Sequence, residues 1–280
     1  MSKISEHLKN SAEILRESGV AESRREAVSL LSFALDKDQT YLIAHDDYKL
    51  SDEEETRFRD FVKRRANREP FQYITGKQNF YGLDFIVSKD VLIPRPETEL
   101  LVETAIKILP ENARFCEVGV GSGCIAVTIL HELKTANAVA LDVSEKALTV
   151  ARLNAEKHKV NERIELKQSD VYKNLNGEKF DLIVSNPPYI SVEEMKTLQS
   201  EVRDYEPAQA LTDGTNGLSI IEKIIKNAPC YLNENGFLLL EIGHLQSAEV
   251  KAMFDETIWR EVESLPDFQK IERVIKAQKI

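Results

Sequence analysis

The stretch ARFCEVGVGSGCIAVTIL, residues 113–130, joins an apolar strand pattern to an apolar helix pattern through a loop with three glycines. Glu117 lies near the end of the strand pattern, and Gly119, Gly121 and Gly123 alternate with other residues. Glycine suits a chain that turns sharply from strand to helix and must approach a ligand without a side chain in between. The stretch therefore predicts the first strand–loop–helix unit of an α/β fold, with a ligand at the loop.

Further strand and helix patterns alternate downstream of this loop. Apolar, β-branched runs separated by helical segments are typical of a doubly wound, mostly parallel sheet. We expect strands near residues 113–118, 138–141, 164–166, 181–185 and 237–242, with weaker ones near Trp259 and residues 271–275. The region 96–280 is therefore predicted to be one Rossmann-like α/β domain with a seven-stranded sheet.

Residues 1–74 have an all-helical pattern, in which Ser51 and Glu54 form a capping box that opens a charged helix. The region carries 13 basic and 15 acidic residues and neither a glycine-rich loop nor a cluster of catalytic side chains. A structural bundle and a partner-binding module both fit this pattern. Residues 75–95 are predicted to form a β-hairpin linker that ends before Pro96. Its alternating apolar residues are Leu83, Phe85 and Val87, then Val91 and Ile93.

The composition excludes several classes of protein. With 42% hydrophobic residues in a chain of 280, the sequence can bury a sizeable core, so overall disorder is excluded. The net charge of −10 argues against a protein whose main task is to grip nucleic-acid phosphates. Cys116, Cys124 and Cys230 form no C-x-x-C pair, and no H-E-x-x-H occurs, so no metal site is expected. With no signal-peptide pattern and only short apolar runs, we expect a cytoplasmic protein without membrane contact.

The spacing of the glycine loop separates it from the common nucleotide-binding loops. In the dinucleotide-binding motif G-x-G-x-x-G, counted from Gly119, the third glycine would stand at position 124, where this chain has Cys124. No G-K-[ST] follows, which excludes a P-loop. Glu117 would repel a pyrophosphate but favour a ligand with an ammonium group and a cationic centre. The predicted cofactor-binding residues of the loop are Glu117, Gly119, Val120, Gly121, Ser122 and Gly123.

Two further acidic positions complete the pattern of a nucleoside cofactor. Asp142 follows the next strand, 23 residues after Gly119, where a carboxylate can accept hydrogen bonds from both hydroxyls of a ribose. Asp170 and Val171 follow the third strand, where a carboxylate could accept from an exocyclic adenine amine. The ordered set of glycine loop, ribose acid and adenine acid predicts S-adenosyl-L-methionine as cofactor.

The tetrapeptide Asn186-Pro187-Pro188-Tyr189 follows the fourth strand pattern and is the predicted catalytic segment. The prolines fix the backbone, so the Asn186 side-chain oxygen and the Pro187 carbonyl can form a rigid pair of acceptors. Such a pair suits a planar NH2 group, which has two protons to donate. Tyr189 offers a ring on which a flat substrate could stack. The target is a planar nitrogen: a glutamine amide, or an amino group of a nucleic-acid base.

The expected chemistry is methyl transfer to this nitrogen. An amide nitrogen is a weak nucleophile that gains positive charge as it attacks a methyl sulfonium. Acceptors aimed at its protons strengthen as that charge grows, which stabilises the transition state more than the ground state. Alignment of nitrogen, methyl and sulfur supplies the rest. No dedicated general base is visible, and none is required, because the product can lose its proton to water.

These motifs together resemble those of the class I S-adenosylmethionine-dependent methyltransferases, and specifically the peptide chain release factor N5-glutamine methyltransferases, the HemK/PrmC family. The segment LIPRPETEL at residues 92–100 is similar to the hallmark of that family. Further similar segments are PFQYITG at residues 70–76, EPAQAL at 206–211, DGTNGL at 213–218 and EIG at 241–243.

The resemblance implies methylation of the glutamine in the GGQ motif of class I peptide chain release factors, which the helical domain would dock. It implies that residues 119–123, Asp142, Asp170, Val171 and Asn186 contact the cofactor, and that residues 186–189 hold the glutamine. Relatives often carry Asp at Glu117 and an aromatic residue at Val171, so stacking beside the adenine could be weaker here.

Three alternatives stay open from the sequence. A sister family methylates a ribosomal protein glutamine, but it tends to lack the PETE continuation present at residues 96–99. A base-specific amino-methyltransferase would be expected to carry a basic groove, which the net charge of −10 argues against. A non-catalytic protein that retains the fold is disfavoured by the intact tetrapeptide and glycine loop.

Overall fold

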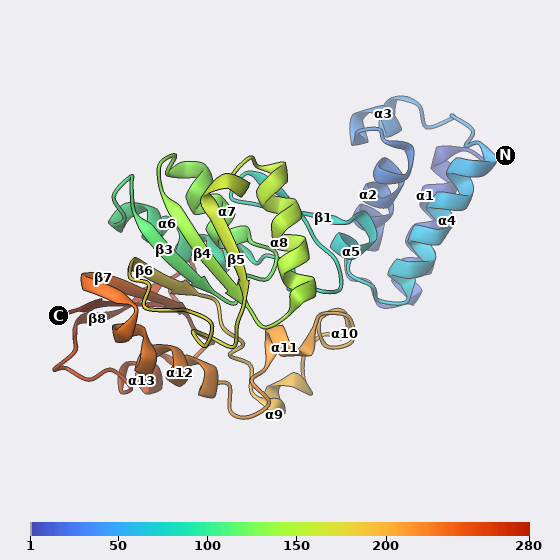
Figure 1. Cartoon of the computed structure of the whole chain (residues 1–280). Coiled ribbons are helices and arrows are strands. Elements are labelled where there is room, and N and C mark those ends of the chain that lie inside the picture. The colour runs from blue at the N-terminus through green and yellow to red at the C-terminus, as the bar shows by residue number, and fades with distance from the viewer. Residues whose placement is uncertain (1) are drawn as a thin grey trace. The chain divides into compact units, whose positions relative to one another are not determined.

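The computed structural model describes residues 2–280 and divides into two compact units. One unit holds the residues through Gly76 together with Gln199–Tyr205, and the other holds Lys77–Leu198 and Glu206–Ile280. Figure 1 shows the first as a group of helices and the second as a sheet flanked by helices. Both units form around their own apolar cores.

The helical unit buries one apolar stripe from each of its longer helices. Its elements are α1 (Ile4–Glu17), α2 (Ser23–Leu35), α3 (Gln39–Ala44), α4 (Asp52–Ala66), α5 (Phe71–Thr75) and α10 (Ser200–Arg203). The capping box expected at the start of α4 is confirmed, with the Ser51 hydroxyl accepting from Glu54 N and the Glu54 carboxylate accepting from Ser51 N. Leu15, Leu30 and Phe58 are fully buried at the centre of the unit.

A buried ionic network holds the distant segment 199–205 in the helical unit. The Arg65 guanidinium, only 8% exposed, forms ion pairs with Glu26 of α2 and with Glu201 of α10. Arg68 adds a second ion pair to Glu201 at 2.6 Å. Because a buried charge that loses its partner is strongly destabilising, these pairs tie the segment firmly to the helices.

The expected seven-stranded, mostly parallel sheet is confirmed, with strand order β5-β4-β3-β6-β7-β9-β8. The first five strands in this order are parallel, and β9 is antiparallel to both of its neighbours, β7 and β8. The strands are β3 (Arg114–Val118), β4 (Asn137–Asp142), β5 (Ile164–Gln168), β6 (Phe180–Ser185), β7 (Leu232–Glu241), β8 (Trp259–Pro266) and β9 (Glu272–Lys279).

Alternate residues of the central strands enter two separate apolar cores, because successive strand side chains point to opposite faces. Phe115 and Leu182 pack with α6 (Glu99–Ile108), α7 (Cys124–Glu132) and α8 (Glu145–Lys157), whereas Cys116 and Ile183 pack on the other face with α12 (Ser219–Asn227) and α13 (Ser247–Lys251). The remaining short helices of the unit are η1 (Pro96–Thr98), η2 (Asn161–Arg163), α9 (Val192–Met195), α11 (Ala208–Leu211) and η3 (Ala228–Cys230).

The strand order reverses between β3 and β6. The chain runs outward from β3 through β4 to β5 and then returns to β6 on the opposite side of β3. In open α/β sheets, ligands bind beyond the carboxyl ends of the strands at such a switch point. The residues that follow β3 and β6 begin with the glycine loop and Asn186, so the topology brings the two predicted motifs together.

The β-hairpin lies earlier than the sequence alternation suggested. It consists of β1 (Lys77–Phe80) and β2 (Leu83–Ile86), joined at Tyr81 and Gly82. Both turn residues have positive φ, of 51° and 74°, as the tight two-residue hairpin turns require. The alternation through Val91 and Ile93 adds no further strand, because the chain turns at residues 89–90 and the segment after this turn pairs with no strand among the described residues.

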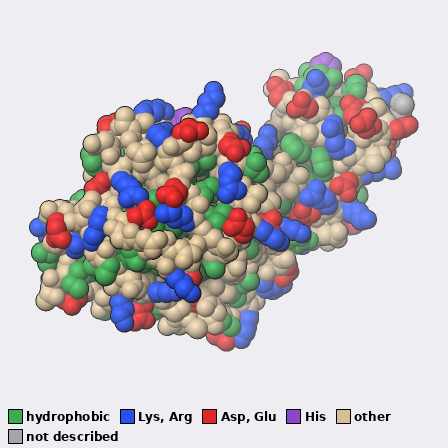
Figure 2. Space-filling model, viewed as in Figure 1, with side chains coloured by type: hydrophobic (Ala, Val, Ile, Leu, Met, Phe, Trp, Pro, Cys, Tyr) green, Lys and Arg blue, Asp and Glu red, His purple; other side chains and the backbone are tan. Residues whose placement is uncertain are grey.

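On the face shown in Figure 2, Lys and Arg side chains alternate with Asp and Glu side chains over both units. No helix within residues 2–280 is both long enough and apolar enough to cross a membrane.

Candidate active site

A pocket opens in the α/β unit beyond the carboxyl ends of β3, β4, β5 and β6. It includes most of the predicted cofactor residues and residues from the segments that precede α6 and form α11. Its lining comprises Asp90, Val91, Leu92, Pro94, Arg95, Thr98, Glu117, Val118, Gly119, Val120, Gly121, Ser122, Cys124, Ile125, Asp142, Val143, Ala147, Ser169, Asp170, Val171, Asn186, Pro188, Pro207, Gln209, Ala210 and Ile220. Gly123, Pro187 and Tyr189 lie outside this lining.

The glycine loop is held in place from the side away from the pocket. Gly123 is the N-cap residue of α7 and has φ of 82°, and a Cβ there would meet Ala151 of α8 at 3.4 Å, so this glycine serves helix packing. The fully buried Asn154 donates from Nδ2 to the carbonyl of Ser122 at 2.8 Å. The same amide also exchanges hydrogen bonds with Ile86 of the hairpin. Asn154 was not predicted from the sequence, since its partners are remote along the chain.

Glu117 presents a buried carboxylate with unused acceptor capacity to the pocket. Its Oε2 accepts from the backbone N of Ala126 at 2.9 Å, whereas Oε1 has no hydrogen-bond partner among the described residues. Burial raises the pKa of Glu117 well above its ordinary value, and the nearby Asp142 raises it further. A buried, unpaired oxygen is costly unless a ligand supplies a donor. This position therefore fits a cationic or N–H donor group of a bound ligand.

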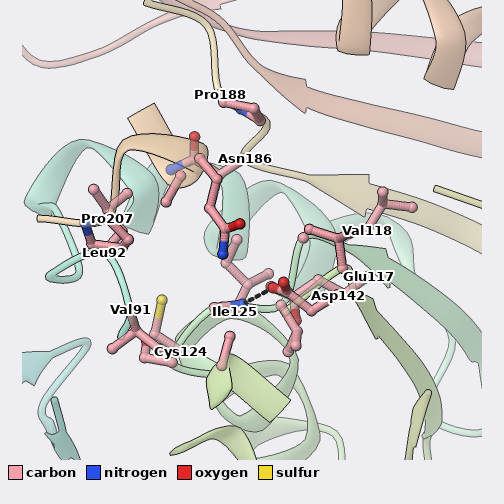
Figure 3. A pocket seen from close by; sticks show the side chains of 18 of the residues that line it. Val91, Leu92, Glu117, Val118, Cys124, Ile125, Asp142, Asn186, Pro188 and Pro207 are labelled. Carbon is pink, nitrogen blue, oxygen red and sulfur yellow. Dashed lines mark hydrogen bonds between the residues drawn. The ribbon is translucent and has the colours of Figure 1, made fainter. Parts of the chain in front are cut away.

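Asp142, the last residue of β4, is fixed by one backbone N–H group of the glycine loop and one of the loop that follows β4. Its Oδ2 accepts from Gly121 N and its Oδ1 from Ser144 N, both at 2.9 Å. Figure 3 shows the hydrogen bond from the glycine loop to Asp142 as a dashed line. Each carboxylate oxygen retains acceptor capacity, so this rigid group can receive two neighbouring hydroxyls.

Asp170 and Val171 also line the pocket. The Asp170 side chain is about half exposed and forms an ion pair with Lys223 of α12 at 2.6 Å. Val171 is buried and adopts φ of 53°, a rare backbone conformation for a β-branched residue. The strained backbone here is held by the surrounding core, as is common at functional sites.

Asn186 directs its side chain into the pocket. In Figure 3 it points toward the space bordered by Glu117 and Asp142, while Leu92 and Pro207 lie on the other side. The Nδ2 group of Asn186 donates to Thr98 Oγ1 at 3.1 Å. No described residue donates to its Oδ1, so this oxygen is free to accept from a ligand.

Three contacts fix the loop that carries the tetrapeptide at Tyr189. The Tyr189 hydroxyl donates to Glu241 Oε1 at 3.2 Å, and its carbonyl accepts from Gln246 Nε2 at 2.9 Å. Gly217 packs beneath the same carbonyl, where a Cβ would lie only 2.1 Å from the oxygen. The turn of Gly217 is itself held by Asp213, whose Oδ1 accepts from Gly217 N at 2.9 Å. Hydrogen bonds from Ser219 and Thr215 lower the pKa of Asp213.

Glu241, at the end of β7, is a fully buried carboxyl group next to this loop. Burial raises its pKa from 4.5 to about 7, and hydrogen bonds from Thr98 and Tyr189 oppose the rise. The charged neighbours are Arg273 of β9, which lowers the pKa, and Glu97 of η1, which raises it. The pKa of Tyr189 is raised strongly by burial, so the tyrosine stays protonated while Glu241 titrates.

Two of the family-like segments meet at one border of the pocket. The buried Glu206 accepts from Ile93 N at 3.1 Å and pairs with the Arg95 guanidinium at 2.5 Å. This contact joins the segment before η1 to the segment that begins α11, and Leu92 and Pro207 from these segments line the pocket. The motifs around residues 92–100 and 206–211 thus form a common wall.

The switch-point pocket, with its glycine loop, acidic strand ends and Asn-Pro-Pro-Tyr segment, defines a class I methyltransferase. A crystal structure of a methyltransferase from Pyrococcus furiosus shares the fold, with a TM-score of 0.54, 18% identity, and coverage of 71% of this chain and 90% of that chain. Residues 96–203 match the methyltransferase small domain family, and residues 6–76 match the PrmC N-terminal domain family. The chain belongs to the release factor glutamine methyltransferase family, which confirms the resemblance seen in the sequence.

Two curated relatives illustrate the match. The release factor glutamine methyltransferase of Geobacter sulfurreducens is 43% identical over 261 residues, which cover 93% of this chain and 91% of the relative. That of Koribacter versatilis is 38% identical over 259 residues, which cover 91% of both proteins.

Proposed function

We propose that this protein transfers a methyl group from S-adenosyl-L-methionine to the side-chain amide nitrogen of the GGQ glutamine in class I peptide chain release factors. The observation that carries the proposal is the Asn186 carboxamide, whose Nδ2 is engaged by Thr98 and whose Oδ1 is left free toward the pocket. The names of the relatives supply the substrate, and the pocket supplies chemistry that fits a carboxamide.

The pocket residues fit S-adenosylmethionine by the chemistry of their free acceptors. Glu117 Oε1 would accept from the ammonium group of the methionine part, and Asp142 would accept from the ribose hydroxyls. Asp170 and Val171 would border the adenine. When bound, the cofactor supplies an electrophilic methyl group on a sulfonium sulfur. Glu117 and Asn186 line the same pocket, which supports this assignment.

The role of the tetrapeptide is to hold the reacting nitrogen. Asn186 Oδ1 and the carbonyl of Pro187 would accept the two protons of the substrate NH2 group and turn its lone pair toward the methyl group. As the new N–C bond forms and the C–S bond breaks, the nitrogen becomes positive and both hydrogen bonds strengthen. The methylated nitrogen then loses one proton to water. The clamped position of Tyr189 keeps the acceptor pair rigid during this step.

The helical unit is the proposed docking module for the release factor. It matches the PrmC N-terminal domain family and contains no residue of the pocket. We propose no direct contact with nucleic acid, because the substrate group is a protein side chain and the net charge is −10. The interspersed charges in Figure 2 agree with this on the face shown.

The proposal is tested by methyl transfer from labelled S-adenosylmethionine to purified release factor. We expect label on the factor and none on a factor whose GGQ glutamine is replaced by alanine. A ribosomal protein and duplex DNA serve as competing acceptors. Full labelling of the replaced factor, or preferential labelling of either competitor, would contradict the proposed substrate.

A further inference from the structure

We propose that Asn154 sets the affinity of the pocket for its cofactor from outside the pocket, as a positioning residue that ties the glycine loop to the β-hairpin. Asn154 lies on α8 and is not among the residues that line the pocket. The inference rests on the part of the proposed function that assigns the cofactor to the glycine loop. It does not depend on the identity of the methyl acceptor.

The glycine loop has little stiffness of its own. Its three glycines have φ of 78°, 52° and 82°, a region of backbone conformation that glycine enters freely. A chain with this freedom populates several conformations unless contacts select one of them. One such contact runs from Gly121 N to Asp142 Oδ2 at 2.9 Å. Asn154 supplies another, to the buried residue Ser122.

The orientation of the Asn154 side chain is fixed by three hydrogen bonds. Nδ2 donates to the carbonyl of Ser122 at 2.8 Å and to the carbonyl of Ile86 at 2.9 Å. Oδ1 accepts from Ile86 N at 2.7 Å. If the amide were turned by 180°, its oxygen would oppose two carbonyl oxygens, so these partners allow one orientation only. The two bonds to β2 therefore direct an N–H group of Asn154 at the glycine loop.

This contact affects binding through the state of the free protein. The apparent Kd rises as the fraction of protein that already has the binding conformation falls. Without Asn154, the buried Ser122 carbonyl would lack its donor, and conformations in which it finds another donor would become more favourable. Those conformations compete with cofactor binding. Saturating cofactor returns the loop to the bound conformation, so KM for the cofactor should change and kcat should not.

The test compares Asn154→Leu with His158→Leu. Leucine has nearly the shape of asparagine but forms no side-chain hydrogen bond. His158, the C-cap residue of α8, also reaches the hairpin, with Nε2 3.0 Å from the Asp84 carbonyl, and it is not part of the pocket lining. Calorimetry should give a Kd of S-adenosylhomocysteine about 10-fold higher or more for Asn154→Leu. For His158→Leu the Kd should stay within about 2-fold of wild type.

Two further readouts separate positioning from a purely structural role. Thermal unfolding measures the stability that each substitution costs, and a structural residue would lower stability without changing the Kd of the folded protein. In steady-state methylation at saturating S-adenosylmethionine, Asn154→Leu should keep kcat within about 2-fold while KM for the cofactor rises with Kd.

A second pair of variants applies if Asn154→Leu does not fold. Ile86→Pro and Ile86→Ala both replace the isoleucine side chain by a smaller one, but only proline removes the N–H group that donates to Asn154. Ile86 is the last residue of β2 and lies outside the pocket lining. The Kd of S-adenosylhomocysteine should be higher for the proline variant than for the alanine variant by about 3-fold or more.

The inference is wrong if folded Asn154→Leu binds S-adenosylhomocysteine with the wild-type Kd, or if His158→Leu loses as much affinity. Equal affinity of the two Ile86 variants overturns it in the second pair. Failure of the cofactor assignment is a separate result, because the wild-type protein itself would then not bind S-adenosylhomocysteine. A raised Kd confined to Asn154→Leu, with kcat retained, supports the positioning role.

Discussion

Replacement of Gly217 by alanine should disable the tetrapeptide without touching the pocket. An added Cβ would lie 2.1 Å from the Tyr189 carbonyl oxygen and 2.7 Å from its carbon, whereas real Cβ contacts essentially never fall below 3.0 Å. Either the loop that carries Asn186 or the turn at Gly217 must therefore move. A displacement of about 1 Å at a positioning group costs about 100-fold in rate. We expect a loss of that order in kcat, with a smaller effect on the Kd of S-adenosylhomocysteine.

Gly214→Ala separates this contact from backbone strain. Gly214 and Gly217 have φ of 77° and 81°, so alanine is strained by about 1–2 kcal/mol at either position. A Cβ at Gly214 meets nothing within 4 Å. Thermal unfolding should show a similar effect of backbone strain in both variants. Steady-state methylation of release factor should show a loss of kcat in Gly217→Ala alone. Equal kcat values for the two folded variants would refute the reasoning.

Three other substitutions test separate parts of the site. Asn186→Ala should lower kcat by about 100-fold or more while cofactor Kd, measured by calorimetry, stays within a few-fold; a protein that no longer folds would show a structural role instead. Glu117→Gln should weaken S-adenosylhomocysteine binding by roughly 10- to 100-fold, because a hydrogen bond to a charged group is lost; unchanged affinity would remove Glu117 from the cofactor site. Burial raises the pKa of Glu241 from 4.5 to about 7, so between these pH values the folded protein retains a proton that the unfolded chain has lost. The stability that this proton contributes therefore decreases as pH rises from 4.5 to about 7. The shift corresponds to about 3 kcal/mol, and Glu241→Gln should gain stability relative to wild type over that interval in denaturant melts; a pH-independent difference would contradict the titration.

The sequence was sufficient to predict those features that depend on local patterns. The glycine loop, the strand-end Asp142 and the capping box at Ser51 each follow from residues a few positions apart. The topology then places the loop and Asn186 at one switch point, as the alternating strands and helices imply.

Features that depend on distant contacts could not be predicted. Thr98 and Asn186 are 88 positions apart, and Tyr189 and Glu241 are 52 apart, so no local pattern links them. The place of residues 199–205 in the helical unit depends on ion pairs of Glu201 with remote arginines. In the hairpin region, the alternation of apolar residues continues past Ile86, where β2 ends. The turn at Gly82 fixes the register of the two strands.

The most direct measurement is a crystal structure of this protein with S-adenosylhomocysteine and a GGQ peptide. We predict that the glutamine Nε2 lies within hydrogen-bonding distance of both Asn186 Oδ1 and the Pro187 carbonyl, with its lone pair toward the sulfur. A complex in which Asn186 presents its NH2 group to the pocket, or in which the glutamine binds away from these two oxygens, would contradict the account.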